Sequence, residues 1–266
     1  MTTETKSIND ANRMKSNANH LAVMLGAVLA VSGLLAATTS ARADGGDCKD
    51  SPIFPPDSHP YGASYGEWLA RYWQWTFAFP VDATPDYLGF GAYGTAPWSA
   101  NQSGKVWFLP LSFGSATLTG TVPEDTALCT ATWTTEWDNT ACPTYTDYSV
   151  EQLIGFLETE WSQVTETSVT IDGVTVRGLG NPQTTPYFVI TPPFAYTLAS
   201  HDNVLANAWG EPCIPDGTTV CPAVAAGQCF IIRPLPVGQH TIQFHVVGGT
   251  SYAITNEITV VPRCDK

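Results

Sequence analysis

Basic residues are scarce in this 266-residue chain, which carries 11 Lys and Arg against 24 Asp and Glu. A chain with so large an acidic excess repels a phosphate backbone, so nucleic acid is excluded as a partner. The same repulsion disfavours anionic membrane surfaces. Neutral sugars, cationic groups and divalent cations remain open as ligands.

The chain also lacks several short motifs that mark familiar catalytic and metal sites. It has no phosphate-binding P-loop and no H-E-x-x-H zinc motif. The G-x-S-x-G spacing occurs at 62–66, but its serine, Ser64, is the predicted cap of a helix with no predicted strand before it, which argues against the nucleophile elbow of a serine hydrolase of the α/β type. No C-x-x-C pair is present, which disfavours a metal site built on cysteine. His240 and His245 lie five positions apart on one predicted strand, so they face opposite sides and cannot share a metal.

Residues 1–43 are predicted to form a signal peptide. Three basic residues precede an apolar run from Leu21 to Ala37, and the segment ends in Ala41-Arg42-Ala43, a small-x-small site for signal peptidase. The run is too short and too quickly followed by polar residues for a membrane span. We therefore expect a secreted or periplasmic protein with cleavage after Ala43, a single β-rich domain over 44–266, and no membrane span in the mature protein. The remaining 7 basic and 22 acidic residues give a mature charge of about −15.

All seven cysteines follow the predicted cleavage site, as expected for a protein that matures in an oxidising compartment. We therefore expect structural disulfides, although spacing leaves their connectivity open. Cys229 lies beside Phe230, Ile231 and Ile232 in a predicted buried strand, which favours an inert core thiol over a reactive one. The set of pairs considered joins Cys129 to Cys142, Cys213 to Cys221, and Cys48 to Cys264.

Short apolar runs separated by turn residues, with 22 Gly and 20 Pro, predict a mainly β protein. A short strand is expected over 105–109 and a hairpin over 168–177, whose Asp172-Gly173 turn suits a type I′ loop. Strands over 240–247 and 252–261 close the chain as an antiparallel pair. The predicted fold is an antiparallel β-sandwich, immunoglobulin-like or jelly-roll-like, with two amphipathic helices packed on it. The Pro- and Cys-rich stretch 210–228 is expected to be a long excursion between strands.

The two helices are predicted over 65–78 and 150–164. Each begins with a capping box, formed by Ser64 with Glu67 and by Ser149 with Gln152, in which the two side chains satisfy orphan backbone donors. Pro80 ends the first helix. The apolar stripe of that helix is aromatic and is expected to form core, whereas Trp73 falls outside the stripe and is expected to be exposed.

Several segments together resemble a family of exported bacterial proteins of unknown function. The resemblance covers nearly all of the predicted mature chain and brings no assigned activity, cofactor or catalytic residue. The segments that carry it are SYGEW (64–68), RYWQW (71–75), QSGKVWFL (102–109), EWDN (136–139), IDGV (171–174) and PLPVGQHTI (234–242).

The densest polar group is Glu136, Asp138 and Asn139, between Trp133 and Cys142. On an extended segment Glu136 and Asp138 point to the same side, so two carboxylates and an amide oxygen could gather around Ca²⁺. No other cofactor is expected. One alternative is a hydrogen-bonded loop whose polar side chains satisfy turn backbone. Another is a hydrolase that uses Glu136 and Asp138 as its carboxylate pair.

Aromatic residues are abundant, with 9 Trp, 10 Tyr and 11 Phe. Flat rings beside carboxylates and amides can hold a sugar, because the ring packs on the apolar face of a pyranose. The expected function is a non-catalytic extracellular module that binds a carbohydrate-like ligand or a cell-envelope component. The alternatives are a structural or surface-associated protein with a Trp-rich core, and the hydrolase above. The predicted ligand-binding residues are Trp73, Trp98, Trp133 and Trp137.

Overall fold

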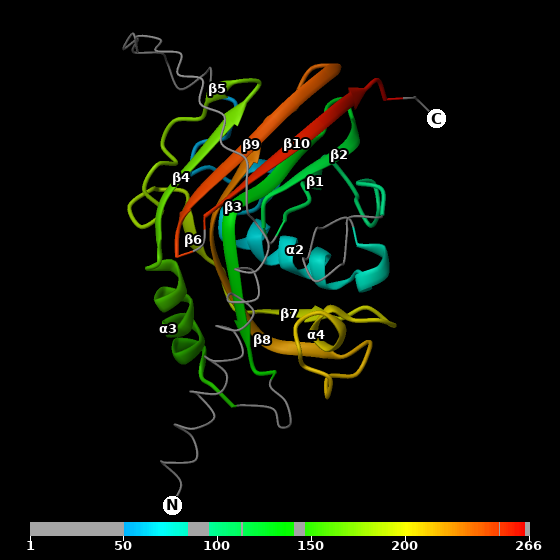
Figure 1. Cartoon of the computed structure of the whole chain (residues 1–266), viewed down its shortest axis with the longest axis vertical. Coiled ribbons are helices and arrows are strands. Elements are labelled where there is room, and N and C mark those ends of the chain that lie inside the picture. Colours follow the sequence, from blue (N-terminus) through cyan, green and yellow to red (C-terminus); the bar gives the residue numbers. More distant parts are fainter. Residues whose placement is uncertain (1–50, 85–95, 113, 141–146, 250, 264–266) are drawn as a thin grey trace, which may run out of the picture. The chain divides into compact units, whose positions relative to one another are not determined.

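Two β-sheets and a few helices make up the described part of the chain in the computed structural model (Figure 1). The structure describes residues 51–84, 96–112, 114–140, 147–249 and 251–263. From Pro52 onward the chain forms one compact unit. The two sheets confirm the prediction of a mainly β protein.

The first sheet has the strand order β1-β3-β8-β6, and β7 also pairs with β8. Strands β3 and β8 are antiparallel along most of their length, with an irregularity between Ala131 and Thr134, whereas β1 runs parallel to β3. The sequence predicted an antiparallel sheet, and the parallel pairing of β1 with β3 shows that this prediction is only partly correct. Its strands are β1 (Val106–Phe108), β3 (Ala127–Asp138), β6 (Phe188–Ile190), β7 (Phe194–Thr197) and β8 (Thr219–Ile232).

Strand β8 corrects the prediction of a long excursion over 210–228. The strand starts at Thr219 and is buried almost continuously from Ala223 to Ile232. Pro222 cannot donate a hydrogen bond to the ladder of this strand. It lies where the pairing of β7 with β8 shifts register, between the partners of Phe194 and Tyr196, so an irregularity in the ladder accommodates the proline.

The second sheet has the order β2-β10-β9-β4-β5. Strands β9 and β10 form the predicted antiparallel pair, and β2 runs parallel to β10. The hairpin of β4 and β5 turns at Asp172 and Gly173, whose φ angles of 51° and 77° confirm the predicted two-residue turn. The strands are β2 (Ala116–Pro123), β4 (Val164–Ile171), β5 (Val174–Thr175), β9 (Gly238–Gly248) and β10 (Tyr252–Val261).

Both predicted helices form, and both capping boxes are present. Helix α2 covers Tyr65–Phe77, and α3 covers Val150–Trp161, which is shorter than predicted because Val164 already belongs to β4. A short α4 (Val204–Asn207) and the 3-10 turns η3 (Pro60–Gly62) and η4 (Val81–Ala83) complete the helical elements described. Among the described residues, none of the helices is long and apolar enough to cross a membrane.

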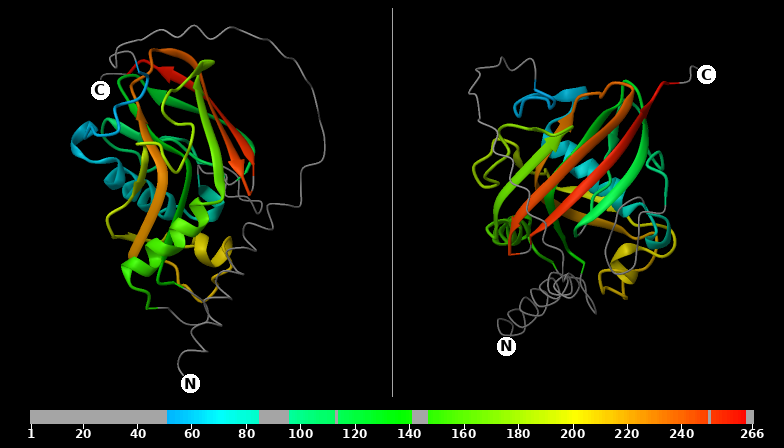
Figure 2. Two further views of the ribbon diagram at one scale, coloured as in Figure 1. Left: turned by 90° about the vertical axis from the view of Figure 1, so that its left-hand side faces the viewer. Right: turned by 45° about the horizontal axis from the view of Figure 1, so that its top comes forward.

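The elements of this unit pack in layers around the first sheet (Figure 2). Helix α2 packs on one face of this sheet, against β3, β7 and β8. The opposite face packs against the second sheet and against α3, as the ring contacts of Phe230 with Phe244 and of Trp133 with Trp161 show. The strands β3 and β8 are therefore covered on both sides, which explains their nearly continuous burial.

Two of the disulfides considered from the sequence are wrong. Cys129 and Cys221 carry free thiols, so neither Cys129–Cys142 nor Cys213–Cys221 forms, although Cys213 itself is disulfide-bonded. Cys129 lies inside β3, and burial raises the pKa of its thiol, with the neighbouring Cys229 acting in the same direction. Cys229 is fully buried, as predicted. The Cys48–Cys264 pair lies outside the described residues.

Candidate functional site

Three of the four tryptophans predicted to bind a ligand are buried. Trp73 is 2% exposed, Trp98 6% and Trp137 4%, whereas Trp133 is half-buried. The expected exposure of Trp73 is therefore wrong. Helix α2 is buried on nearly every side, since residues 194–209 cover the face that a simple amphipathic pattern leaves to solvent. The indole N–H of Trp73 donates to Thr134 Oγ1 at 3.0 Å, which fixes this ring as part of the core.

Trp98 has a different reason for its burial. Its indole lies directly against the backbone of Gly120 on β2, where a Cβ atom would come within 2.0 Å of a ring carbon. The ring can approach so closely because glycine has no side chain. Trp98 thus packs against a sheet face and does not present an open ring to solvent.

The acidic group of Asp138 and its neighbours binds other parts of the protein. Asp138 is 2% exposed, and its Oδ1 accepts from both the N–H and the hydroxyl of Thr140 at 2.6 Å, while Oδ2 accepts from the hydroxyl of Tyr196. The side-chain oxygen of Asn139 accepts a hydrogen bond from the N–H of Tyr148 at 2.9 Å, and its amide nitrogen donates to the carbonyl of Tyr148 at 3.2 Å. These bonds match the hydrogen-bonded loop considered as an alternative to a Ca²⁺ site. In the part of the chain described, no group of three or more His, Cys, Asp or Glu is placed to hold a metal.

A pocket of about 390 Å³ lies elsewhere, between the start of α2 and the segment that leads into β1. We call it the aromatic–cationic pocket. It combines three aromatic rings, two cations and two small polar side chains, so it offers both apolar contact and hydrogen-bond donors. The side chains of interest are those of Tyr61, Trp68, Arg71, Asn101, Ser103 and Lys105.

Trp68 forms a fixed wall of this pocket. Its indole N–H donates to the carbonyl of Pro60 at 2.9 Å, and its ring meets the ring of Phe108 edge-on, with centroids 6.3 Å apart. The guanidinium of Arg71 lies over the same indole, 4.6 Å from the ring centroid. Cation–π attraction of this kind holds the flexible arginine in place.

The rim of the pocket contains three residues with left-handed backbone. Tyr61 has φ 56°, Asn101 φ 52° and Gly104 φ 73°. This region is unfavourable for a bulky side chain such as Tyr61, and residues held there often belong to binding sites. The ring of Tyr61 is also 42% exposed, which is rare among the large apolar side chains described. Burial raises the pKa of its hydroxyl, with the charge of Arg233 acting in the opposite direction, so the phenol stays neutral at physiological pH.

The segment opposite α2 is anchored by Gln102. Its side-chain amide donates to the carbonyl of Phe108 at 2.7 Å, and its carbonyl oxygen accepts the N–H of Phe108 at 2.9 Å. These two hydrogen bonds close residues 102–108 into a loop, and β1 then pairs with β3. The loop that carries Ser103 and Lys105 is therefore held in shape before any ligand binds, which lowers the entropy cost of binding.

The sequence did contain a signal for this site. Arg71 and Lys105 are among the few cations of the chain, and each lies in or beside an aromatic-rich segment, RYWQW and QSGKVWFL. What the sequence did not show is that the two segments meet. That depends on the pairing of β1 with β3 under α2 and on the left-handed conformation of Tyr61 and Asn101.

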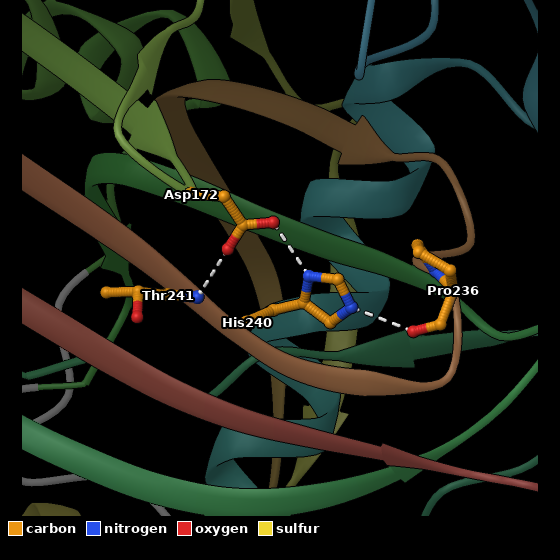
Figure 3. Close-up of polar contacts among 4 residues, drawn as sticks. All are labelled: Asp172, Pro236, His240 and Thr241. Carbon is orange, nitrogen blue, oxygen red and sulfur yellow. Dashed lines mark hydrogen bonds and ion pairs between the residues drawn. The ribbon is translucent and has the colours of Figure 1, made fainter.

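A second polar cluster, which shares no residue with the lining of the pocket, lies at the β4–β5 turn (Figure 3). Asp172 Oδ2 lies 2.7 Å from His240 Nδ1, and its Oδ1 accepts the N–H of Thr241 at 2.8 Å. The other ring nitrogen of His240 lies 2.8 Å from the carbonyl of Pro236. Every partner here belongs to a turn or a strand end, so the cluster ties the hairpin to the start of β9.

Comparison with known proteins gives no family for this chain. No family model matches the sequence, and no curated protein matches it. A solved structure titled "Structure of PbICP-C in complex with falcipain-2" has a chain that is 15% identical, with 60% of this chain and 100% of that chain covered. Its TM-score of 0.20 is too low for the similarity to inform the fold or the function.

Proposed function

We propose that this protein is an exported, non-catalytic binding module that holds a carbohydrate-like ligand in the aromatic–cationic pocket. The observation that carries the proposal is the combination, in one pocket of about 390 Å³, of an exposed Tyr61 ring, the Trp68 wall and several polar side chains. A pocket of this volume is in the usual range for small-ligand sites. The predicted signal peptide supports an extracellular or periplasmic ligand.

The chemistry of the pocket suits a sugar. An aromatic ring packs on the apolar face of a pyranose, and the exposed Tyr61 ring supplies that surface at the rim. The amide of Asn101, the hydroxyl of Ser103 and the cationic side chains can bond the hydroxyl groups of the ring. The Gln102 clamp and the Trp68–Arg71 contact hold these groups in fixed positions.

A binding role fits this pocket better than hydrolysis. Glycoside hydrolysis needs a pair of carboxyl groups beside the scissile bond. Among the described residues that line the pocket, none carries a carboxylate. The carboxylate of Asp138 in the alternative site accepts hydrogen bonds from Thr140 and Tyr196, which supports a structural role for it.

Retention by insoluble polysaccharides tests the proposal. The mature protein from Asp44 onward is expected to be retained selectively by one member of a panel of polysaccharides. The variant Tyr61→Gly removes the ring and relieves the left-handed backbone, so retention should be lost with no decrease in melting temperature. Tyr61→Phe keeps the ring and should keep retention. Equal retention of the wild type and Tyr61→Gly would contradict the proposal.

The control for surface changes is Val174→Ala. Val174 is 66% exposed and lies in β5, outside the lining of the pocket. This variant should be retained like the wild type. If Val174→Ala and Tyr61→Gly lost retention together, the binding surface would lie elsewhere.

A further inference from the structure

We infer that the ligand of the aromatic–cationic pocket is an acidic sugar, whose carboxylate is bound by Arg71 and Lys105. This inference rests on the proposed function and adds the charge of the ligand to it. It follows from the distribution of positive charge over a strongly acidic chain.

Positive charge is concentrated around this pocket. The described part of the chain contains five Lys and Arg side chains, and two of them, Arg71 and Lys105, line the pocket. A third, Arg233, lies over the ring of Phe54 at 4.1 Å, and that ring contacts Tyr61 at the rim. The charge of Arg233 also acts on the hydroxyl of Tyr61. In a chain with 24 acidic residues, three of five described cations therefore lie at or beside one pocket.

The two cations of the pocket lack a carboxylate partner in the described residues. The ion pair found there joins His240 to Asp172, and neither Arg71 nor Lys105 lies within 4.0 Å of a carboxylate of another described residue. Glu67 is the acidic residue one helical turn before Arg71. Its carboxylate accepts from the N–H and the hydroxyl of Ser64, at 2.7 and 2.9 Å, as part of the α2 cap. The hydrogen bonds from Ser64 lower the pKa of Glu67, and the charge of Arg71 lowers it further, but the two side chains form no ion pair within 4.0 Å and Arg71 is exposed, so its guanidinium can meet a ligand.

The geometry of Arg71 suits a carboxylate. A guanidinium presents several N–H donors in a rigid plane, and it can bind both oxygens of one carboxylate. The guanidinium lies over the Trp68 ring, 4.6 Å from its centroid, and Arg71 is exposed at the pocket. Lys105 follows Gly104, whose left-handed backbone turns the loop at the pocket, and it adds a second positive charge. A sugar that carries a carboxylate would then satisfy the rings and the cations together.

Charged and neutral forms of the same polysaccharide test this inference. The probes are polygalacturonate, alginate and hyaluronate, each compared with its methyl-esterified form, which removes the charge and keeps the sugar. The mature protein is expected to bind at least one acidic form about tenfold more tightly than its ester, because a charge-assisted hydrogen bond is worth about that factor or more. Dextran sulfate, which carries sulfate groups and no carboxylates, shows whether the pocket prefers sulfate to carboxylate.

Three substitutions locate the effect. Arg71→Gln and Lys105→Gln should each weaken binding of the acidic form by about tenfold more than they weaken binding of the ester. Arg177→Gln removes the same charge from a residue that does not line the pocket, and it should change neither affinity. A melting temperature equal to that of the wild type shows that each variant is folded.

The outcomes separate this inference from the proposed function. Equal affinity for acid and ester, with both lost in Tyr61→Gly, would overturn the inference and leave the proposed function standing. Tighter binding of dextran sulfate than of every uronate would overturn the assignment of a carboxylate. Binding of none of the sugars, acidic or neutral, would overturn both proposals.

Discussion

The Asp172–His240 pair should make the stability of the fold depend on pH. The carbonyl of Pro236 can only accept, so His240 Nε2 carries a proton, and a second proton on Nδ1 is favoured by the carboxylate of Asp172 (Figure 3). Burial opposes the charged ring, but the hydrogen bonds to Asp172 and to Pro236 outweigh it and raise the pKa of His240 above 6.5. Burial likewise raises the pKa of Asp172, but the bonds from His240 and Thr241 lower it below 3.8 overall.

The pKa shifts of His240 and Asp172 define the pH range in which the pair stabilises the fold. The raised pKa of His240 contributes stability that is fully present below the unfolded value of about 6.5 and is lost as the pH rises through the folded pKa. The lowered pKa of Asp172 contributes stability that is present above about 3.8 and is lost as the pH falls through its folded pKa. The pair should therefore stabilise the fold most between about pH 4 and pH 6.5.

The contribution of the Asp172–His240 pair to stability depends on how far the two side chains are exposed to water. The side chain of His240 is 9% exposed and that of Asp172 is 45% exposed, so water screens the pair on one side. Exposed ion pairs contribute about 0.2–1 kcal/mol, and we expect the upper part of that range because His240 is nearly covered. For a unit of this size, ~1 kcal/mol corresponds to a change of about 2–4 °C in Tm.

Urea denaturation at a series of pH values measures this contribution. His240→Gln should be less stable than the wild type by about 1 kcal/mol near pH 5.5, and the difference should shrink as the pH rises above the folded pKa. His245→Gln removes an exposed histidine from the same strand and should show no such convergence. A difference between wild type and His240→Gln that stays constant from pH 5.5 to about pH 9 would refute the reasoning.

Three further predictions concern the core. Gly120→Ala should destabilise the fold by about 1–3 kcal/mol, measured by denaturation, because the new methyl group overlaps the Trp98 ring; a neutral effect would show that the ring moves freely. Alkylation of the native protein followed by mass spectrometry should label Cys221, which is exposed, and spare Cys129, whose buried thiol has a raised pKa; labelling of both at one rate would contradict this. Asp138→Asn should lower stability by about 1–3 kcal/mol with or without Ca²⁺, whereas a loss seen only with Ca²⁺ would favour the metal site.

Local rules predicted the elements that depend on neighbouring residues. Both capping boxes, the Asp172-Gly173 turn and the bounds of β10 follow from side chains within a few positions of one another. The pairing of β2 with β10 in parallel joins segments more than a hundred residues apart, and no local pattern indicates it. Periodicity therefore predicted some of the strands, such as β9 and β10, but it could not predict which strands pair.

The candidate site was missed for a related reason. The sequence interpretation chose tryptophans for their chemistry, and it judged Trp73 exposed from its place on the helix. Exposure depends on which segments cover a helix, and for α2 those are the first sheet and the segment around Tyr196 and Trp209. The tyrosine that does reach solvent, Tyr61, lies in a short turn with no periodic signal at all.

The rate of acetylation at Lys105 tests the central claim most directly. Lys105 is exposed in the pocket, so an amine-directed reagent should modify it readily in the free protein. A soluble carbohydrate that the protein binds should slow the reaction at Lys105, measured by mass spectrometry of the modified peptide, and should slow it less in Tyr61→Gly. An unchanged rate at Lys105 under saturating ligand would place the binding site outside the aromatic–cationic pocket and contradict the account.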